Sequence, residues 1–102
     1  MSDATVLSID LIVSDPRIRG GRPILAGTSL RVQDVAAHHK YRKYTPEELA
    51  VQLQISLAQV HAALAYYYAH QDEIGAQIEE DDRLIREAKD QGLGQRHPPV
   101  LR

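Results

Sequence analysis

Two helix-start signals in the middle of the chain constrain its fold more than any other feature. In the first, Thr45 can cap a helix that begins at Pro46, and Glu48 can bond back to the cap. In the second, Ser56 has a glutamine three residues later and repeats the pattern. We expect one helix from Pro46 to about Leu53 and a longer one after Ser56. Two helices joined by so short a turn form a helix-turn-helix outline.

The residues before these helices predict extended structure and then a supporting helix. Residues 6–13 are β-branched and roughly alternating, which is typical of a strand. Residues 23–26 and 29–32 predict two short extended pieces about a glycine turn, forming a small β-hairpin. A short helix that begins near Asp34 then has to end within residues 41–44.

A last helix is predicted over residues 72–91, where oppositely charged side chains recur four residues apart above a thin apolar stripe. We divide the 102 residues into a hairpin and helix-turn-helix domain (1–70), an acidic helical segment (71–91) and a flexible tail (92–102). The predicted fold is mainly α, with a small N-terminal β-hairpin, a three-helix helix-turn-helix unit and a C-terminal acidic helix.

Charge is divided unevenly along the chain, although the net charge is only −2. Residues 1–44 hold seven Lys or Arg against four Asp or Glu, residues 45–70 hold no base, and residues 71–91 hold eight acids against three bases. Basic side chains near the helix-turn-helix are candidates for phosphate contacts, although an ordinary basic surface has the same composition. The predicted DNA-binding residues are Arg22, Arg31, Lys40, Arg42, Lys43 and Gln59.

The second helix of the pair has two different faces. One arc, which includes Leu57, Tyr67 and Tyr68, is apolar and is predicted to enter the core. The opposite arc is rich in alanine, where a DNA-reading helix would carry basic or amide side chains. Because alanine lets another backbone come close, we expect a dimer contact there. The predicted dimer residues are Ala58, Ala62, Ala65 and Tyr66.

The acidic segment is the candidate surface for a second protein. Its carboxylates suit a basic or metal-dependent site on a partner. A solvated face with internal salt bridges would have the same sequence. The predicted partner-binding residues are Ile78, Glu79, Glu80, Asp81, Asp82 and Ile85.

Catalytic and metal sites are not indicated. The chain has no Cys, which excludes disulfides, thiolate metal sites and a cysteine nucleophile and suits a reducing cytoplasm. Its five histidines lack helical metal-ligand spacing, and its serines lack a nucleophile-elbow context. No apolar run approaches the roughly 18 residues of a membrane span. We expect a cytoplasmic protein that is not an enzyme, uses no cofactor or metal, and does not contact the membrane.

Residues 21–32, with the sequence GRPILAGTSLRV, resemble the family called domain of unknown function 433. Residues 45–49 and 55–69 are similar to the family's second and third helices, and the resemblance covers about residues 9–75. It implies a homeodomain-like helix-turn-helix protein, usually dimeric, that is encoded beside a PIN-like ribonuclease and regarded as a VapB-like antitoxin. The folded part would then bind its own operator, and the C-terminal segment would cover the toxin's acidic, metal-dependent nuclease site.

Two functions are consistent with the sequence. In the first, the chain is a homodimeric or higher-order type II antitoxin that neutralises a PIN-like toxin and binds operator DNA as an autorepressor. In the second, the helix-turn-helix is only a packing motif, and the chain is a protein-interaction or self-assembly module that does not bind DNA. DNA affinity that falls steeply with salt is expected only of the first.

Overall fold

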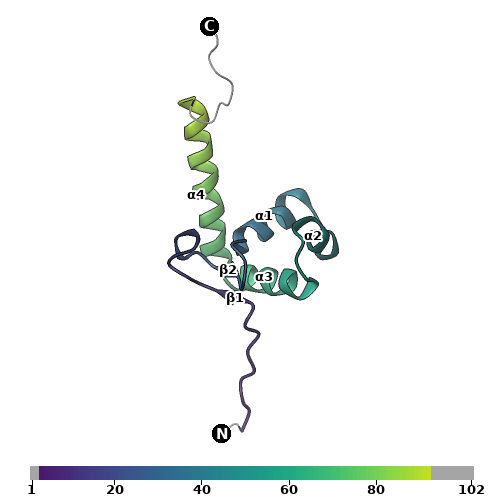
Figure 1. Ribbon diagram of the computed structural model, residues 1–102. Coiled ribbons are helices and arrows are strands. Elements are labelled where there is room, and N and C mark those ends of the chain that lie inside the picture. Colours follow the sequence, from purple (N-terminus) through teal and green to yellow (C-terminus); the bar gives the residue numbers. More distant parts are fainter. Residues whose placement is uncertain (1–2, 93–102) are drawn as a thin grey trace.

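In the computed structural model, which describes residues 3–92, a small sheet precedes four helices. The helices are α1 (Val32–Arg42), α2 (Pro46–Leu53), α3 (Leu57–Ala69) and α4 (Gln71–Asp90). α1, α2 and α3 pack together as the body of the molecule, while α4 rises on one side and the N-terminal residues extend on the other (Figure 1). This architecture confirms a mainly helical chain with a small sheet near its N-terminus.

The sheet consists of two short antiparallel strands, β1 (Ile12–Val13) and β2 (Ile24–Leu25). Ile12 lies opposite Leu25, and Val13 lies opposite Ile24. The strand predicted over residues 6–13 is therefore wrong for most of its length. Alternation in the sequence marks which residues can form a strand, but β2 offers a partner only to the last two of them.

The glycine turn predicted after β2 is present. Gly27 has φ +80°, and the backbone on its far side returns so that Ile24 forms an isolated bridge with Arg31. The Leu25 N–H donates to the Leu30 carbonyl at 2.9 Å. The second half of the predicted hairpin thus follows β2 without forming a strand of its own.

Capping boxes set the starts of α2 and α3 as the sequence predicts. The Thr45 hydroxyl accepts the Glu48 N–H at 3.1 Å, and the Glu48 carboxylate accepts the Thr45 N–H at 2.8 Å. Ser56 and Gln59 make the same reciprocal pair at 3.0 and 2.8 Å. α2 ends at Leu53, and the capping residue Gln54 has a left-handed φ of +58°, so the turn to α3 is short.

α1 begins at Val32, two residues before the expected start near Asp34. Asp34 acts as a first-turn cap, because its carboxylate accepts the Arg31 N–H at 3.0 Å and also binds the Arg31 guanidinium. The helix ends at Arg42, and the capping residue Lys43 has a left-handed φ of +64°. This end lies within residues 41–44, as predicted.

The core lies where the three helices of the body meet α4. Leu57 and Tyr68 were predicted to enter it, but they are 41% and 57% exposed. Each stands at or near an end of α3, where the neighbouring helices no longer cover the apolar arc. The buried core residues are Leu25, Val32, Val35, Ala36, Leu49, Val60, Ala63, Leu64, Tyr67, Ile74 and Ile78.

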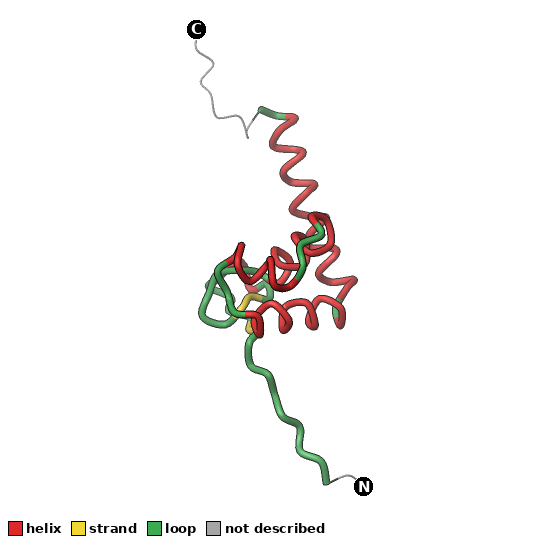
Figure 2. The backbone as a smooth tube through the Cα atoms, turned by 90° about the vertical axis from the view of Figure 1, so that its right-hand side faces the viewer, coloured by secondary structure: helices red, strands yellow, loops and turns green. Residues whose placement is uncertain are grey.

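α4 confirms the predicted helical character of the acidic segment. Only His70 separates it from α3, and the chain changes direction there, so that α4 leaves the body (Figure 2). Its first turns place Ile74 and Ile78 in the core. Gly92 follows with φ +77°, and the rest of the predicted tail lies outside the described residues.

Candidate functional site

Three of the predicted DNA-binding residues, Lys40, Arg42 and Lys43, come together at the C-terminal end of α1. All three side chains are exposed, since they lie on the last turn of the helix and at its left-handed cap. The Lys40 ammonium also lies over the Tyr41 ring, 5.5 Å from the ring centre. We call Lys40, Arg42 and Lys43 the basic corner.

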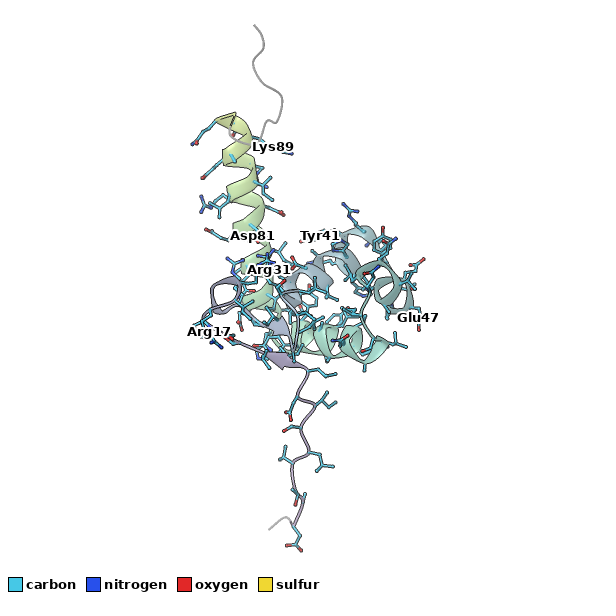
Figure 3. The ribbon with its side chains drawn as sticks, in the orientation of Figure 1. Arg17, Arg31, Tyr41, Glu47, Asp81 and Lys89 are labelled. Atoms are coloured by element: carbon cyan, nitrogen blue, oxygen red, sulfur yellow. The ribbon has the colours of Figure 1, made fainter. Side chains whose placement is uncertain are left out.

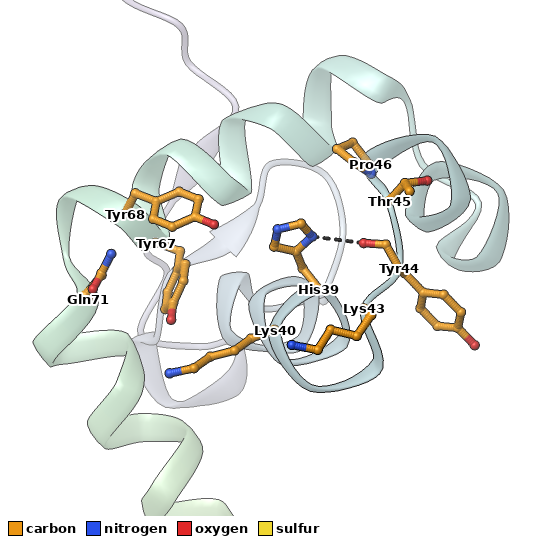
Figure 4. A pocket seen from close by; sticks show the side chains of 9 residues that line it. All are labelled: His39, Lys40, Lys43, Tyr44, Thr45, Pro46, Tyr67, Tyr68 and Gln71. Carbon is orange, nitrogen blue, oxygen red and sulfur yellow. Dashed lines mark hydrogen bonds between the residues drawn. The ribbon is translucent and has the colours of Figure 1, made fainter.

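A groove of about 540 Å³ opens beside the basic corner (Figure 4). Lys40 and Lys43 stand on one side of it, and Tyr68 and Gln71 on the other. No carboxylate lines this groove in the described part of the chain, so its charge is positive. Its lining residues are His39, Lys40, Lys43, Tyr44, Thr45, Pro46, Tyr67, Tyr68 and Gln71.

One wall of the groove is made of aromatic side chains. Tyr67 and Tyr68 lie with their ring centres 5.1 Å apart, and the His39 ring nitrogen bonds to the Tyr44 carbonyl at 2.9 Å. Exposed lysine side chains beside such a wall can contact a phosphate backbone while the apolar surface contacts sugar or base. Chemically, the arrangement could contact a nucleic-acid backbone.

Arg22 and Arg31, also predicted to bind DNA, instead contact Asp81 of α4 (Figure 3 shows Arg31 and Asp81). Each guanidinium donates to an Asp81 oxygen at 2.9 Å. The Gln33 amide donates to Asp81 at 2.9 Å and accepts from Arg22 at 2.7 Å. Arg31 also binds Asp34. We call Arg22, Arg31, Gln33 and Asp81 the α4 clamp.

The clamp shifts the pKa of two of its members, Asp81 and Arg31. Burial alone raises the pKa of Asp81, but the hydrogen bond and charge of Arg22 and the charge of Arg31 outweigh it, so the pKa lies below its usual value. Burial also acts to lower the pKa of Arg31, and the Asp34 and Asp81 carboxylates reverse that effect and raise it. Both arginines are therefore already paired with a carboxylate of the same chain. A DNA phosphate would have to compete with Asp81 for them.

The predicted partner-binding residues fall into two groups along α4. Ile78 and Asp81 face the body and belong to the core and the clamp. Glu79, Glu80, Asp82 and Ile85 are exposed. Residues 82–90, which we call the outer half of α4, extend past the clamp, as the position of Lys89 in Figure 3 shows. There Leu84 and Ile85 are 47% and 54% exposed.

The predicted dimer residues on α3 remain accessible only in part. Ala58 and Ala65 are exposed, whereas Ala62 and Tyr66 are half-buried. The Tyr66 ring stacks on the His70 ring, with centres 4.0 Å apart. The Gln59 side chain, predicted to contact DNA, accepts the Ser56 N–H and so serves the start of α3.

Gln33 is the functional side chain that sequence reasoning missed. It is 4% exposed, and its amide joins two elements far apart in the chain. An isolated glutamine in a short amphipathic helix carries no signal of such a role. The groove residues His39 and Gln71 were also missed. They are far apart in the sequence, and only the approach of α4 to α1 brings them to the same groove.

The described residues contain neither a metal-binding cluster nor a membrane-spanning helix. Between residues 3 and 92, no group of three His, Asp or Glu side chains is arranged to hold a metal ion. No described helix is both long and apolar enough to cross a bilayer.

Comparison with known proteins gives a family but no activity. Residues 12–67, which run from β1 to the buried Tyr67 on α3, match the family described as Protein of unknown function (DUF433). The chain belongs to the DUF433 family. The match contains the basic corner and leaves out α4 and the residues before β1. Neither a curated protein nor a solved structure matches the chain.

Proposed function

We propose that this DUF433 chain is a type II antitoxin, which binds and neutralises a PIN-like ribonuclease and binds operator DNA as an autorepressor. The nature of the partner follows from the resemblance of residues 21–32 and of the helix-turn-helix to the antitoxin-like family. The observation that carries the proposal is the outer half of α4, which leaves the body and exposes large aliphatic side chains.

The outer half of α4 has the features of a helix that docks in a groove of another protein. Ile85 stands one turn after Asp81 and continues the stripe that Ile78 begins. A hollow of about 170 Å³, lined by Arg31, Ile78, Asp81 and Ile85 among others, lies at the foot of this stripe. A partner that covers Ile85 would therefore also touch the body, which gives the contact a defined position.

The charged residues of the outer half fit the expected partner as well. Arg86 and Lys89 are exposed, and no ion pair in residues 3–92 engages either one. Cations in this position can pair with the acidic groups of a metal-dependent nuclease site. Arg83, in contrast, is held by Glu80 and Glu87 at 2.8 and 2.6 Å.

Co-purification with the product of the adjacent gene, which the proposal predicts to be a PIN-like ribonuclease, tests the partner contact. The variant carries Leu84→Asp and Ile85→Asp, and the matched control carries Val51→Asp, since Val51 is another aliphatic residue, 78% exposed on α2. The full-length chain and the control should retain the ribonuclease, and the double variant should lose it. Point variants are preferable to removal of α4, because Ile74 and Ile78 belong to the core. Equal retention by all three would refute the assignment.

The DNA-binding part of the proposal rests on the basic corner and its groove. Arg22 and Arg31 are engaged by Asp81, and the exposed Arg17 is paired with Asp15. The basic corner is therefore the place where three exposed cations lie together in the DUF433-matched region. Three phosphate contacts predict that log K falls with log salt with a slope of about −2.7 per copy. Because α3 carries no Lys or Arg, backbone contacts contribute more than base reading.

Fluorescence anisotropy with operator-region DNA tests this part separately. Lys40, Arg42 and Lys43 are changed together to Gln, and the control changes Arg83, Arg86 and Lys89, which removes the same charge from α4. The corner variant should bind weakly with little salt dependence, whereas the control should keep the wild-type slope. A corner variant with the wild-type slope would favour the alternative, a protein-interaction module that does not bind DNA.

A further inference from the structure

Three of the four residues of the α4 clamp belong to the body of the molecule. Arg22 lies two residues before β2, Arg31 stands at the N-cap of α1, and Gln33 lies in the first turn of α1. Each donates a hydrogen bond to the carboxylate of Asp81, the clamp residue that α4 supplies (Figure 3). The three donors lie inside the DUF433 match and Asp81 lies outside it. The clamp is therefore a site on the body that α4 fills with one carboxylate.

The body holds the three donors in place without help from α4. The Asp34 carboxylate accepts hydrogen bonds from the Arg31 guanidinium, from Nε at 3.1 Å and from Nη2 at 2.9 Å. The side-chain oxygen of the buried Gln33 accepts from Arg22 at 2.7 Å. Guanidinium groups recognise carboxylate and phosphate with the same forked geometry. The same donors can therefore accept phosphate oxygens in place of the Asp81 carboxylate.

The contact of α4 with this site is separable from its contact with the core. Within residues 3–92, every side-chain hydrogen bond between α4 and the body ends on Asp81. Ile74 and Ile78, which anchor α4 in the core, both precede it. In the docked helix the Gln77 side-chain oxygen is buried without a hydrogen-bond partner in the described chain, which is destabilising. The part of α4 after Ile78 can thus move away while the core stays packed.

We infer that Arg22, Arg31 and Gln33 form a second phosphate-binding site, which Asp81 fills in the free chain and a DNA phosphate fills when α4 is displaced. The inference rests on the DNA binding proposed above and adds a means of regulating it. Asp81 acts as a substitute for phosphate within the chain, so docking of α4 weakens DNA binding.

The position of the second site fits DNA. The clamp and the basic corner lie at opposite ends of α1, which has 11 residues and is about 16 Å long. The major groove of B-DNA is about 12 Å wide. Cations at the two ends of α1 can therefore reach phosphates on the two sides of one groove, which a single contact on a partner protein would not require.

Displacement of Asp81 frees about one positive charge per copy. Arg31 stays paired with Asp34, whereas Arg22 has no carboxylate partner other than Asp81 in the described chain. One further phosphate contact changes the slope of log K against log salt by about −0.9. The slope of about −2.7 expected from the basic corner should therefore steepen to about −3.6 when the clamp is open.

Fluorescence anisotropy with operator-region DNA, repeated over a range of salt concentrations, tests the competition. Asp81→Asn opens the clamp, and Asp82→Asn is the matched control, because it removes the same charge from the next, exposed residue. Arg22→Gln is measured alone and together with Asp81→Asn. Far-UV circular dichroism at the assay temperature checks that each variant is folded, and Arg22→Gln alone tests the masking without opening the clamp at Asp81.

We expect D81N to bind DNA roughly 5–10-fold more tightly than D82N, with the steeper slope, because it gains one charged contact. Arg22→Gln should leave the slope of the wild-type chain unchanged, since Asp81 masks Arg22 there. In the D81N background the same substitution should return the slope to about −2.7. Binding by D81N under conditions in which the wild type does not bind would also support the inference.

Three results would overturn it. If the wild type binds DNA through the basic corner but D81N and D82N bind alike, the second site is absent and the DNA-binding proposal stands. If Arg22→Gln flattens the slope of the wild-type chain, Arg22 already contacts DNA and Asp81 does not mask it. If neither the wild type nor D81N binds DNA, the inference and the DNA-binding proposal both fail.

Discussion

Replacing Asp81 with Asn tests the α4 clamp, which ties the acidic helix to the body. Asp81 accepts hydrogen bonds from Arg22, Arg31 and Gln33, each at 2.9 Å. An Asn side chain has the same shape but only one acceptor oxygen, and its amide would face a guanidinium. The substitution therefore leaves the core intact and removes one charge together with most of the clamp.

The expected cost follows from the burial of the cluster. A hydrogen bond to a charged group contributes about 1.5–3 kcal/mol when buried, whereas an exposed ion pair contributes about 0–1 kcal/mol. The side chains of Asp81, Arg22 and Arg31 are 26%, 27% and 17% exposed, which is between these limits. We expect D81N to lower the free energy of unfolding by about 1–2 kcal/mol, and each kcal/mol lowers Tm by roughly 4–8 °C in a domain of this size.

Asp82→Asn is the matched control, because Asp82 is the next residue, carries the same charge and is exposed. We expect it to change the free energy of unfolding by less than about 0.5 kcal/mol. Urea denaturation of the full chain, followed by far-UV circular dichroism, measures both variants. Equal stabilities of D81N and D82N would refute the clamp, because both variants remove one negative charge from neighbouring positions and only D81N removes the contacts to Arg22, Arg31 and Gln33.

The effect of D81N should also depend on pH. The pKa of Asp81 is lower in the folded chain than in the unfolded chain, so its contribution is complete above the unfolded value of about 3.9. It is lost as the pH falls through the lower, folded value. The stability difference between wild type and D81N should therefore be constant near neutral pH and shrink below about pH 4. A difference that persists unchanged into strong acid would mean that Asp81 acts through its shape alone.

The helix ends give two further predictions, both measured by urea denaturation. Thr45→Ala removes the hydroxyl that accepts the Glu48 N–H and should cost about 1 kcal/mol, and a cost below about 0.3 kcal/mol would show that the cap is not needed. Gln54→Gly should stabilise the chain by about 0.5–1 kcal/mol, because Gln54 has φ +58° and glycine adopts that conformation without strain. A loss of stability would instead assign the Gln54 side chain a contact of its own.

Local signals predicted the helices of this chain well. The capping boxes at Thr45 and Ser56 depend on residues three positions apart, so the sequence alone places the starts of α2 and α3. The alternating residues 6–13 gave an equally clear pattern and predicted a strand, but a strand also needs a partner strand to pair with. Only β2 supplies one within a single copy, and its two residues pair with Ile12–Val13.

The candidate site was less predictable, because it depends on how α4 crosses α1. Four consecutive acids begin at Glu79, and the sequence does not show which of them turns toward the body. The way α4 crosses α1 turns Asp81 toward the body. Asp81 then pairs with Arg22 and Arg31, so these two cations are no longer free to bind DNA. The basic corner was predictable, because its three residues are close in sequence and end a helix.

Inhibition of the ribonuclease that the proposal expects from the adjacent gene is the most direct test of the antitoxin proposal. The purified ribonuclease is assayed on an RNA substrate with its metal ion while the full-length chain, the Leu84→Asp/Ile85→Asp variant or the Val51→Asp control is titrated in. We predict that the wild type and the control abolish cleavage at stoichiometric amounts and that the double variant leaves cleavage unchanged. Cleavage that continues in the presence of excess wild-type chain, or inhibition equally strong with the double variant, would contradict the account.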